Sequence, residues 1–330
     1  MMMKKYFYSA LIFLLTCSSA TAQRIFPGLG GQRAGITVFQ FLKIGVTPRA
    51  EGMGGSFVAI SDDASALYWN PAGAVRSGAN ELMFANTQWF ADIGLNYGAY
   101  LHHLTDQDAI GVSVTSLQTG DMERTTVLAP SGTGAYFSYQ DLAVGVTYSR
   151  AMTDQFSFGV TAKYVRESIA ELAMQEVMID LGAFYYTGYA NSRFGITLSN
   201  FGGTTKPEGI ATSIGLGEVS DFQEFSPPTV FRMAFAFEPY QSETYRMTMS
   251  VQLNHPNDNA ENLSLGGEFA WTETVFLRGG YKINVEEQQM PSYGIGVRIP
   301  VEYTTIRFDY GSANFGTLGN THRFSVSFTL

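Results

Sequence analysis

The residues that could perform chemistry in this chain of 330 residues match no catalytic or metal-binding pattern. Serine and aspartate are common, but the G-x-S-x-G elbow that presents a nucleophilic serine does not occur. His102 and His103 are adjacent, and adjacent residues on a strand point to opposite faces, so this pair is poorly placed to share a metal ion. We therefore expect no enzyme activity, no catalytic residue, no metal site and no cofactor.

Two glycine-rich runs, residues 28–31 and 52–55, resemble the start of a nucleotide-binding loop. Neither run completes the pattern G-x-G-x-x-G, because Arg33 and Phe57 stand where the third glycine belongs. No strand–helix–strand unit surrounds them either. We interpret both runs as turns or as close packing of the backbone.

The most informative polar side chains are charges that alternate with apolar residues at a period of two. They are Lys163, Asp180, Arg232, Glu238, Arg246, Glu268, Arg278, Lys282, Arg298, Arg307 and Asp309. Such a set either lines a lumen that binds or guides a solute, or forms ion pairs that brace a wall and hold an internal segment. Both signs are interleaved, which favours ion pairs, because buried charges need partners.

The alternation requires these charges to lie on strands. Between Tyr245 and Asn254, for example, Tyr, Met, Met, Val and Leu alternate with Arg, Thr, Ser, Gln and Asn. A strand sorts the two sets onto opposite faces, whereas a helix scatters both around its circumference. Fourteen such segments are predicted at 80–90, 95–104, 108–118, 138–151, 156–169, 176–187, 192–202, 229–240, 245–255, 261–271, 274–284, 291–300, 304–313 and 321–330.

These segments have the dimensions of strands that cross a membrane. Each is near the ~9–11 residues that span a bilayer at a tilt, and their number is even. Short turns at 152–155 and 257–260 alternate with longer connections at 119–137, 203–228 and 285–290, and we expect the short and long connections at opposite ends of a barrel. Aromatic residues gather at segment ends, as in an interfacial girdle: Trp89, Tyr100, Tyr148, Tyr164, Tyr185, Tyr186, Tyr240 and Trp271.

The composition agrees with an all-β transmembrane outer-membrane barrel of about 14 antiparallel strands. Only 15% of residues are charged, 14% are aromatic and 35 are glycine, which argues against a disordered chain and against a helical bundle. The net charge of −9 argues against nucleic-acid binding. A secreted β-sandwich also alternates, but its second face would be a dry core, whereas here that face carries Arg, Lys, Asp, Glu and Gly.

The first 22 residues have the pattern of a secretory signal peptide. Two lysines precede an apolar stretch, and an A-x-A cleavage site ends at Ala22, so Gln23 would begin the mature chain. Lipidation of Cys17 is the alternative interpretation.

Residues 23–79 are rich in glycine and lack the alternation of the later segments. Ser61 is a candidate N-cap of a short helix, which Pro71 should end near position 70. A fourteen-stranded barrel is too wide for its own side chains to fill. We therefore expect residues 23–79 to form a hatch, or plug, with short helices inside the barrel of residues 80–330. A periplasmic extension is the alternative.

One run in this part of the chain resembles a known family. Residues 49–73, RAEGMGGSFVAISDDASALYWNPAG, are similar to the N-terminal signature of PorV/PorQ-type outer-membrane proteins, in the wider FadL-like group of fourteen-stranded barrels. The resemblance implies that Asn70, Pro71 and Ala72 belong to a hatch in the lumen. The chain departs from the common pattern of barrels in ending on Leu330 rather than on phenylalanine.

The resemblance implies two functions. In the PorV branch it implies a role in type IX secretion, with a translocon or exported cargo as protein partner at the cell surface. In FadL-like barrels it implies transport of hydrophobic small molecules, and Phe184, Tyr186 and Phe276 interrupt the polar faces where such a ligand could lie or the hatch could pack. An open diffusion porin is a third interpretation, which the hatch disfavours. Each interpretation places the protein in outer-membrane lipid of a Gram-negative, Bacteroidota-like cell.

Overall fold

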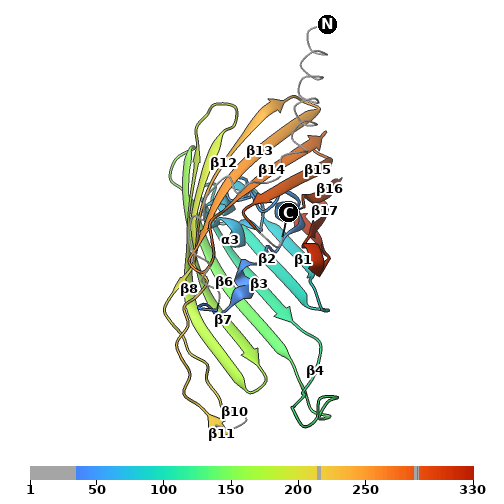
Figure 1. Cartoon of the computed structure of the whole chain (residues 1–330). Coiled ribbons are helices and arrows are strands. Elements are labelled where there is room, and N and C mark those ends of the chain that lie inside the picture. The colour runs from blue at the N-terminus through green and yellow to red at the C-terminus, as the bar shows by residue number, and fades with distance from the viewer. Residues whose placement is uncertain (1–34, 214–216, 286–287, 289) are drawn as a thin grey trace.

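Fourteen antiparallel strands close into a barrel in the computed structural model, which describes residues 35–213, 217–285, 288 and 290–330 (Figure 1). The barrel strands are β1 (Glu81–Gln88), β2 (Gly94–His103), β3 (Asp108–Gln118), β6 (Tyr139–Ala151), β7 (Phe156–Ile169), β8 (Leu172–Tyr186), β9 (Arg193–Gly202), β12 (Val230–Gln241), β13 (Tyr245–Pro256), β14 (Asn262–Trp271), β15 (Val275–Ile283), β16 (Ser292–Val301), β17 (Thr304–Asn314) and β18 (Asn320–Thr329). Each strand pairs with its neighbours along the chain, and β1 pairs with β18 to close the ring. The predicted signal peptide and its cleavage site lie outside the described residues.

All fourteen predicted segments are confirmed as barrel strands. Their bounds agree with the prediction within two residues, except that β8 begins at Leu172, four residues before the predicted start. Leu172 pairs with Ile169 across a tight turn, so the pairing with β7 extends β8 beyond the part with clear alternation.

Side chains alternate between outward and inward positions along these strands. On β13, Met247 and Met249 are 38% and 40% exposed, whereas Thr248 between them is fully buried. Six of the eight aromatic residues predicted for the interfacial girdle point outwards. The prediction is wrong for Trp89, whose ring lies under the guanidinium of Arg323, and for Tyr186, whose ring lies under that of Arg76. Tyr186 follows an outward-facing tyrosine, and successive residues of a strand face opposite sides.

The two ends of the barrel differ in their connections. At one end, called the turn end, six connections of two to six residues join the strands, and the other end, called the loop end, carries residues 119–138 and 203–229. The prediction is wrong for the turn at 257–260, which lies at the loop end, because successive connections in an antiparallel barrel alternate between ends. Turn residues determine how tight a connection is, but they do not determine its end.

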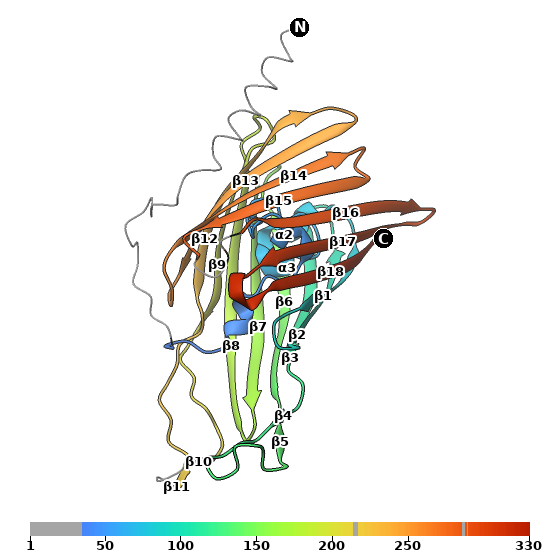
Figure 2. The same ribbon diagram turned by 45° about the vertical axis from the view of Figure 1, so that its right-hand side comes forward.

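Two small hairpins extend the loop end. They are formed by β4 (Met122–Glu123) with β5 (Tyr136–Phe137), and by β10 (Ala211–Ser213) with β11 (Gly217–Val219). Both lie beyond the barrel strands at the same end of the molecule (Figures 1 and 2).

Residues 35–79, called the hatch below, lie inside the barrel (Figure 2). The hatch contains η2 (Gln40–Lys43), α2 (Pro48–Gly52), α3 (Ala66–Trp69) and η3 (Pro71–Arg76), and a further short turn, η4 (Gly316–Leu318), connects β17 to β18. Its large apolar side chains form the core: Phe39, Met53, Phe57, Ile60 and Leu67 are at most 1% exposed. No helix in the described ranges is long and apolar enough to cross a membrane.

The short helix before Pro71 ends as predicted, at Trp69. The predicted cap is wrong, because α3 begins only at Ala66, and the Ser61 hydroxyl donates to the carbonyl oxygen of Phe57 (2.9 Å). The side chain of Ser61 therefore stabilises the preceding turn of the hatch.

Candidate functional site

Glycines on the inner wall allow the hatch backbone to touch the strands directly. A Cβ atom on Gly280 would lie 2.0 Å from the nitrogen of Gly54, and one on Gly266 would lie 2.6 Å from the oxygen of Met53. Close-packed backbone atoms cannot rotate aside as a side chain can, so a larger residue at these positions must displace the hatch. Other wall glycines whose Cβ would lie less than 3.0 Å from a hatch atom are Gly111, Gly159, Gly182, Gly195 and Gly311. The shape of the wall thus matches the hatch.

The Asn-Pro-Ala segment packs against two of these glycines. The amide of Asn70 donates to the carbonyl oxygen of Val58 in the hatch and to one in β8 (2.9 and 3.3 Å), and its Oδ1 accepts from the nitrogen of Ala72 (3.1 Å). Pro71 begins η3, and a Cβ on Gly159 of β7 would lie 2.3 Å from its carbonyl carbon. These contacts join the hatch to β7 and β8.

A cluster of buried charges joins the hatch to the opposite wall. Arg49 of α2 donates to Glu268 on β14 (Nε–Oε2 3.2 Å) and to Asp63 in the hatch (2.7 Å). Glu268 also accepts from Arg278 (2.7 Å), which in turn donates to Asp309 (2.7 Å). None of these five side chains is more than 9% exposed. The cluster therefore links α2 to β14, β15 and β17 away from water.

A second hatch carboxylate, Glu51, holds α2 to β15 and β18. Its oxygens lie 3.6 Å from Lys282 Nζ and 3.6 Å from Arg323 Nη2, and Gln288 Nε2 donates to it at 3.2 Å. Burial alone would raise the pKa of Glu51, but the positive charges of Arg323 and Lys282 outweigh it and lower the pKa from 4.5 to about 2. Glu51 is therefore ionised at neutral pH.

The contacts of Glu51 predict an acid dependence of hatch stability. Because its folded-state pKa lies below 4.5, ionised Glu51 stabilises the folded protein above pH 4.5, and this stabilisation is lost as the pH falls towards 2. We expect Glu51→Gln to lower the unfolding temperature at pH 7 and to flatten its pH dependence between 4.5 and 2. Thermal unfolding of the detergent-solubilised barrel across this range measures both effects. Parallel pH curves for the two proteins would contradict the assignment.

Ten of the eleven predicted inward charges lie within 4.0 Å of an opposite charge. The pairs are Lys163–Asp180 (2.8 Å), Glu238–Arg193 (3.0 Å), Arg246–Glu268 (3.5 Å), Arg278–Glu268 (2.7 Å), Lys282–Glu51 (3.6 Å), Arg298–Glu273 (3.8 Å) and Arg307–Asp309 (3.0 Å). Arg232 is the exception: within the described part of the chain, no carboxylate pairs with it, and its Nη1 donates to the hydroxyl of Ser199 (3.0 Å). The geometry of the other ten is that of an ion-pair network.

The charged residues of this network that are absent from the predicted set include Arg49, Glu51, Arg193 and Arg323. Arg193 and Arg323 follow the same alternation as the predicted charges, and that signal would have identified them. Arg49 and Glu51 lie in the glycine- and alanine-rich run 49–73, where two opposite charges two residues apart are the available signal.

The aromatic residues that interrupt the polar faces are packed against other side chains. Phe276 is 1% exposed, and the guanidinium carbons of Arg278, Arg298 and Arg307 lie 5.5, 5.3 and 4.7 Å from its ring centre. Phe184 is also 1% exposed and lies 5.1 Å from the ring of Tyr186. Phe276 therefore packs under cations, where cation–π attraction stabilises it.

Two cavities lie on opposite sides of the hatch. The loop-end cavity has a volume of about 480 Å³ and reaches the connections after β13, β15 and β17. The turn-end cavity has a volume of about 320 Å³ and is lined by residues such as Asp62, Asp63 and Arg307. The two cavities share no lining residue among those that the structure describes.

Comparison with protein families identifies a match over residues 30–256, to the family described as "Type IX secretion system protein PorV". The chain belongs to the PorV family. No curated protein matches the sequence. Family and fold together show a PorV-family outer-membrane barrel of a Gram-negative bacterium, and in such barrels the longer connections are extracellular. The loop end of this PorV-family barrel therefore faces the cell exterior.

Solved structures of FadL-like barrels share the fold. The Ralstonia pickettii toluene transporter TbuX is 12% identical, with a TM-score of 0.58 over 86% of this chain and 97% of that one. A Pseudomonas aeruginosa FadL homologue is 11% identical, with a TM-score of 0.55 over 87% and 99%. The Pseudomonas putida toluene transporter TodX is 12% identical, with a TM-score of 0.53 over 85% and 95%. At these identities the likeness shows the fold alone. The family is described as a secretion system protein, and TbuX and TodX are described as transporters.

Proposed function

We propose that this PorV-family barrel acts in type IX secretion as a closed scaffold whose extracellular face binds a protein partner, the translocon or exported cargo. The observation that carries the proposal is the exposed apolar side chains of the β4–β5 hairpin, which projects beyond the barrel at the loop end (Figure 1). Val127 and Leu128, between β4 and β5, are 84% and 96% exposed, and Tyr136 is 63% exposed. Apolar side chains gathered on a water-facing loop are typical of a protein-binding surface.

The hairpins are attached to the barrel by specific contacts. Arg124 donates to Glu171 between β7 and β8 (2.7 Å), although both side chains are largely exposed. The backbones of Glu208 and Ala173 pair through two hydrogen bonds of 2.8 and 3.0 Å. These contacts support a defined position of the hairpins relative to the barrel, as a docking surface requires.

The hatch supports a scaffold rather than an open porin. We propose that residues 23–79 form this hatch and residues 80–330 the barrel, after export directed by residues 1–22 in a Bacteroidota-like cell. The wall glycines, Asn70 and the cluster around Glu268 hold the hatch against opposite sides of the wall. A conducting path would require these contacts to break.

Transport of a hydrophobic ligand is the second candidate, and the charges in both cavities disfavour it. The loop-end cavity is lined by charged and amide groups together with apolar side chains such as Trp89, Phe90 and Phe315, and the turn-end cavity is lined by charged and hydroxyl groups. Phe276, a candidate for an apolar path, is covered by guanidinium groups. An apolar ligand would have to desolvate the charged and amide groups that share these linings, which disfavours its binding.

Aspartate substitutions at the hairpin tip test the proposed surface. We expect Val127→Asp with Leu128→Asp to reduce the amount of copurifying secretion partner at least tenfold, because a charge in an apolar contact costs about 2 kcal/mol or more. Quantitative mass spectrometry of mild-detergent pull-downs from the native host measures this loss.

The matched control is Tyr189→Asp, a substitution of an 83% exposed aromatic residue at the turn end. It should leave copurification unchanged. Equal recovery of partners with the hairpin variant and the wild type would overturn the proposal.

A further inference from the structure

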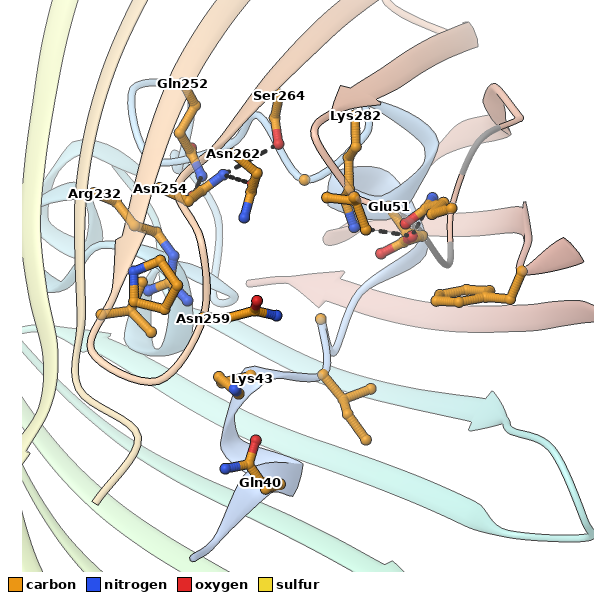
Figure 3. A pocket seen from close by; sticks show the side chains of 18 of the residues that line it. Gln40, Lys43, Glu51, Arg232, Gln252, Asn254, Asn259, Asn262, Ser264 and Lys282 are labelled. Atoms are coloured by element: carbon orange, nitrogen blue, oxygen red, sulfur yellow. Dashed lines mark hydrogen bonds and ion pairs between the residues drawn. The ribbon is translucent and has the colours of Figure 1, made fainter. Parts of the chain in front are cut away.

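The loop-end cavity contains a buried cation, Arg232, that pairs with no carboxylate of the described residues. Arg232 on β12 is 7% exposed and lines the cavity together with amide side chains of β13 and β14 (Figure 3). The cavity's other cations have partners: Lys43 pairs with Asp258 at 2.8 Å, and Lys282 and Arg323 share Glu51. Among the described residues, the four cations of the cavity therefore outnumber the two carboxylates that pair with them.

Arg232 retains donors that can bind a ligand. Its Nη1 donates to Ser199, and its other N–H groups make no hydrogen bond with the described residues. The guanidinium carbon lies 6.0 Å from the ring centre of Trp69, which places an aromatic face beside it. Figure 3 shows Arg232 and Asn259 facing the open space between the β12–β14 wall and η2.

The amide side chains add further donors. Asn254 donates to Asn262 Oδ1 (2.8 Å), and the nitrogen of Ala260 donates to Asn259 Oδ1 (2.8 Å). The NH₂ groups of Asn262 and Asn259 donate to no described residue, so they add hydrogen-bond donors to the cavity lining. Donors beside an unpaired guanidinium match a ligand that has a negative charge and several hydrogen-bond acceptors.

We propose that the loop-end cavity binds a small hydroxylated carboxylate, the chemistry of a sugar acid, with its carboxylate on Arg232. A guanidinium forms two parallel hydrogen bonds with a carboxylate, which matches the open N–H groups of Arg232. Hydroxyl groups both donate and accept, so they match the amides. The volume of about 480 Å³ is that of a small-ligand site. This site goes beyond the proposed protein-binding surface and does not use the hairpins.

Calorimetric titration of the full barrel in detergent tests the proposal, with sodium glucuronate as the probe. We expect the wild type to bind glucuronate, and Arg232→Gln to weaken that binding at least tenfold, which is the effect of a lost charge-assisted hydrogen bond. Glucose has the hydroxyl groups without the carboxylate and should bind at least tenfold more weakly than glucuronate. No binding of glucuronate to the wild type, or equal binding of glucose, would overturn the proposal.

The matched control is Arg298→Gln, which removes another inward arginine that lines the turn-end cavity. It should bind glucuronate as the wild type does. If Arg232→Gln does not give a folded barrel, Asn259→Leu provides the test. Asn259 lies in a connection outside the strands, where a substitution disturbs the barrel least. Asn259→Leu should weaken glucuronate binding severalfold. Wild-type affinity in either folded variant would contradict the site.

Discussion

Gly280→Ala is expected to displace the hatch and to open the barrel to ions. The added Cβ would lie 2.0 Å from the nitrogen of Gly54 and 2.1 Å from the carbonyl carbon of Met53. Both are backbone atoms, so no rotamer change relieves the overlap and the hatch or the strand must move. Overpacking of this kind costs about 1–3 kcal/mol, and more where nothing yields. We expect a higher single-channel conductance in planar bilayers and a lower unfolding temperature than for the wild type.

The adjacent residue supplies the control. Gly279 faces lipid, and a Cβ there would have no atom within 4 Å. Gly279→Ala changes the same strand by the same methyl group, so effects on strand propensity or membrane insertion should appear in both variants. Closed channels and wild-type stability in both variants would show that the hatch does not contact Gly280. An equal loss of stability in both variants would show that the effect arises in the strand and not in its contact with the hatch.

The barrel could be predicted because its pattern is local. Along β13, Tyr245, Met247 and Met249 alternate with polar residues, and a membrane-spanning strand must place those two sets in different media. Because the alternation recurs in fourteen segments, it predicts the number of strands and their positions. The alternation does not predict features that depend on distant parts of the chain. The turn at 257–260 is tight, but its end of the barrel depends on the number of strands before it.

The candidate site could be predicted only in part. Alternation placed Glu268 and Arg278 on inner faces, but their joint contact with Arg49 arises from the path of a hatch that has no periodicity. The alternation likewise predicted Arg232 as one inward charge among eleven. Its lack of a carboxylate partner depends on which side chains the barrel brings together, and sequence spacing does not contain that information.

Glu268→Gln is expected to cause the largest loss of stability among substitutions that keep a side chain's shape. The Glu268 carboxylate is fully buried and lies 3.2 Å from Arg49, 2.7 Å from Arg278 and 3.8 Å from Arg307. The neutral amide would remove the negative charge that compensates these buried guanidinium groups. Breaking a buried ion pair costs about 3–5 kcal/mol, because the remaining charge stays desolvated. Urea unfolding in lipid vesicles, followed by tryptophan fluorescence, measures the loss.

Glu273→Gln is the matched control, because both carboxylates contact the same guanidinium. Arg246 lies 3.5 Å from Glu268 and 2.6 Å from Glu273, but the Glu273 side chain is 47% exposed at the turn end. Water screens an exposed pair, so its loss should cost about 0–1 kcal/mol. The difference between the variants therefore isolates burial from the removal of one charge near Arg246. A small and equal loss in both would mean that the Glu268 cluster does not hold the hatch, whereas a large loss for Glu268→Gln alone would assign that role to the buried contact with Arg49.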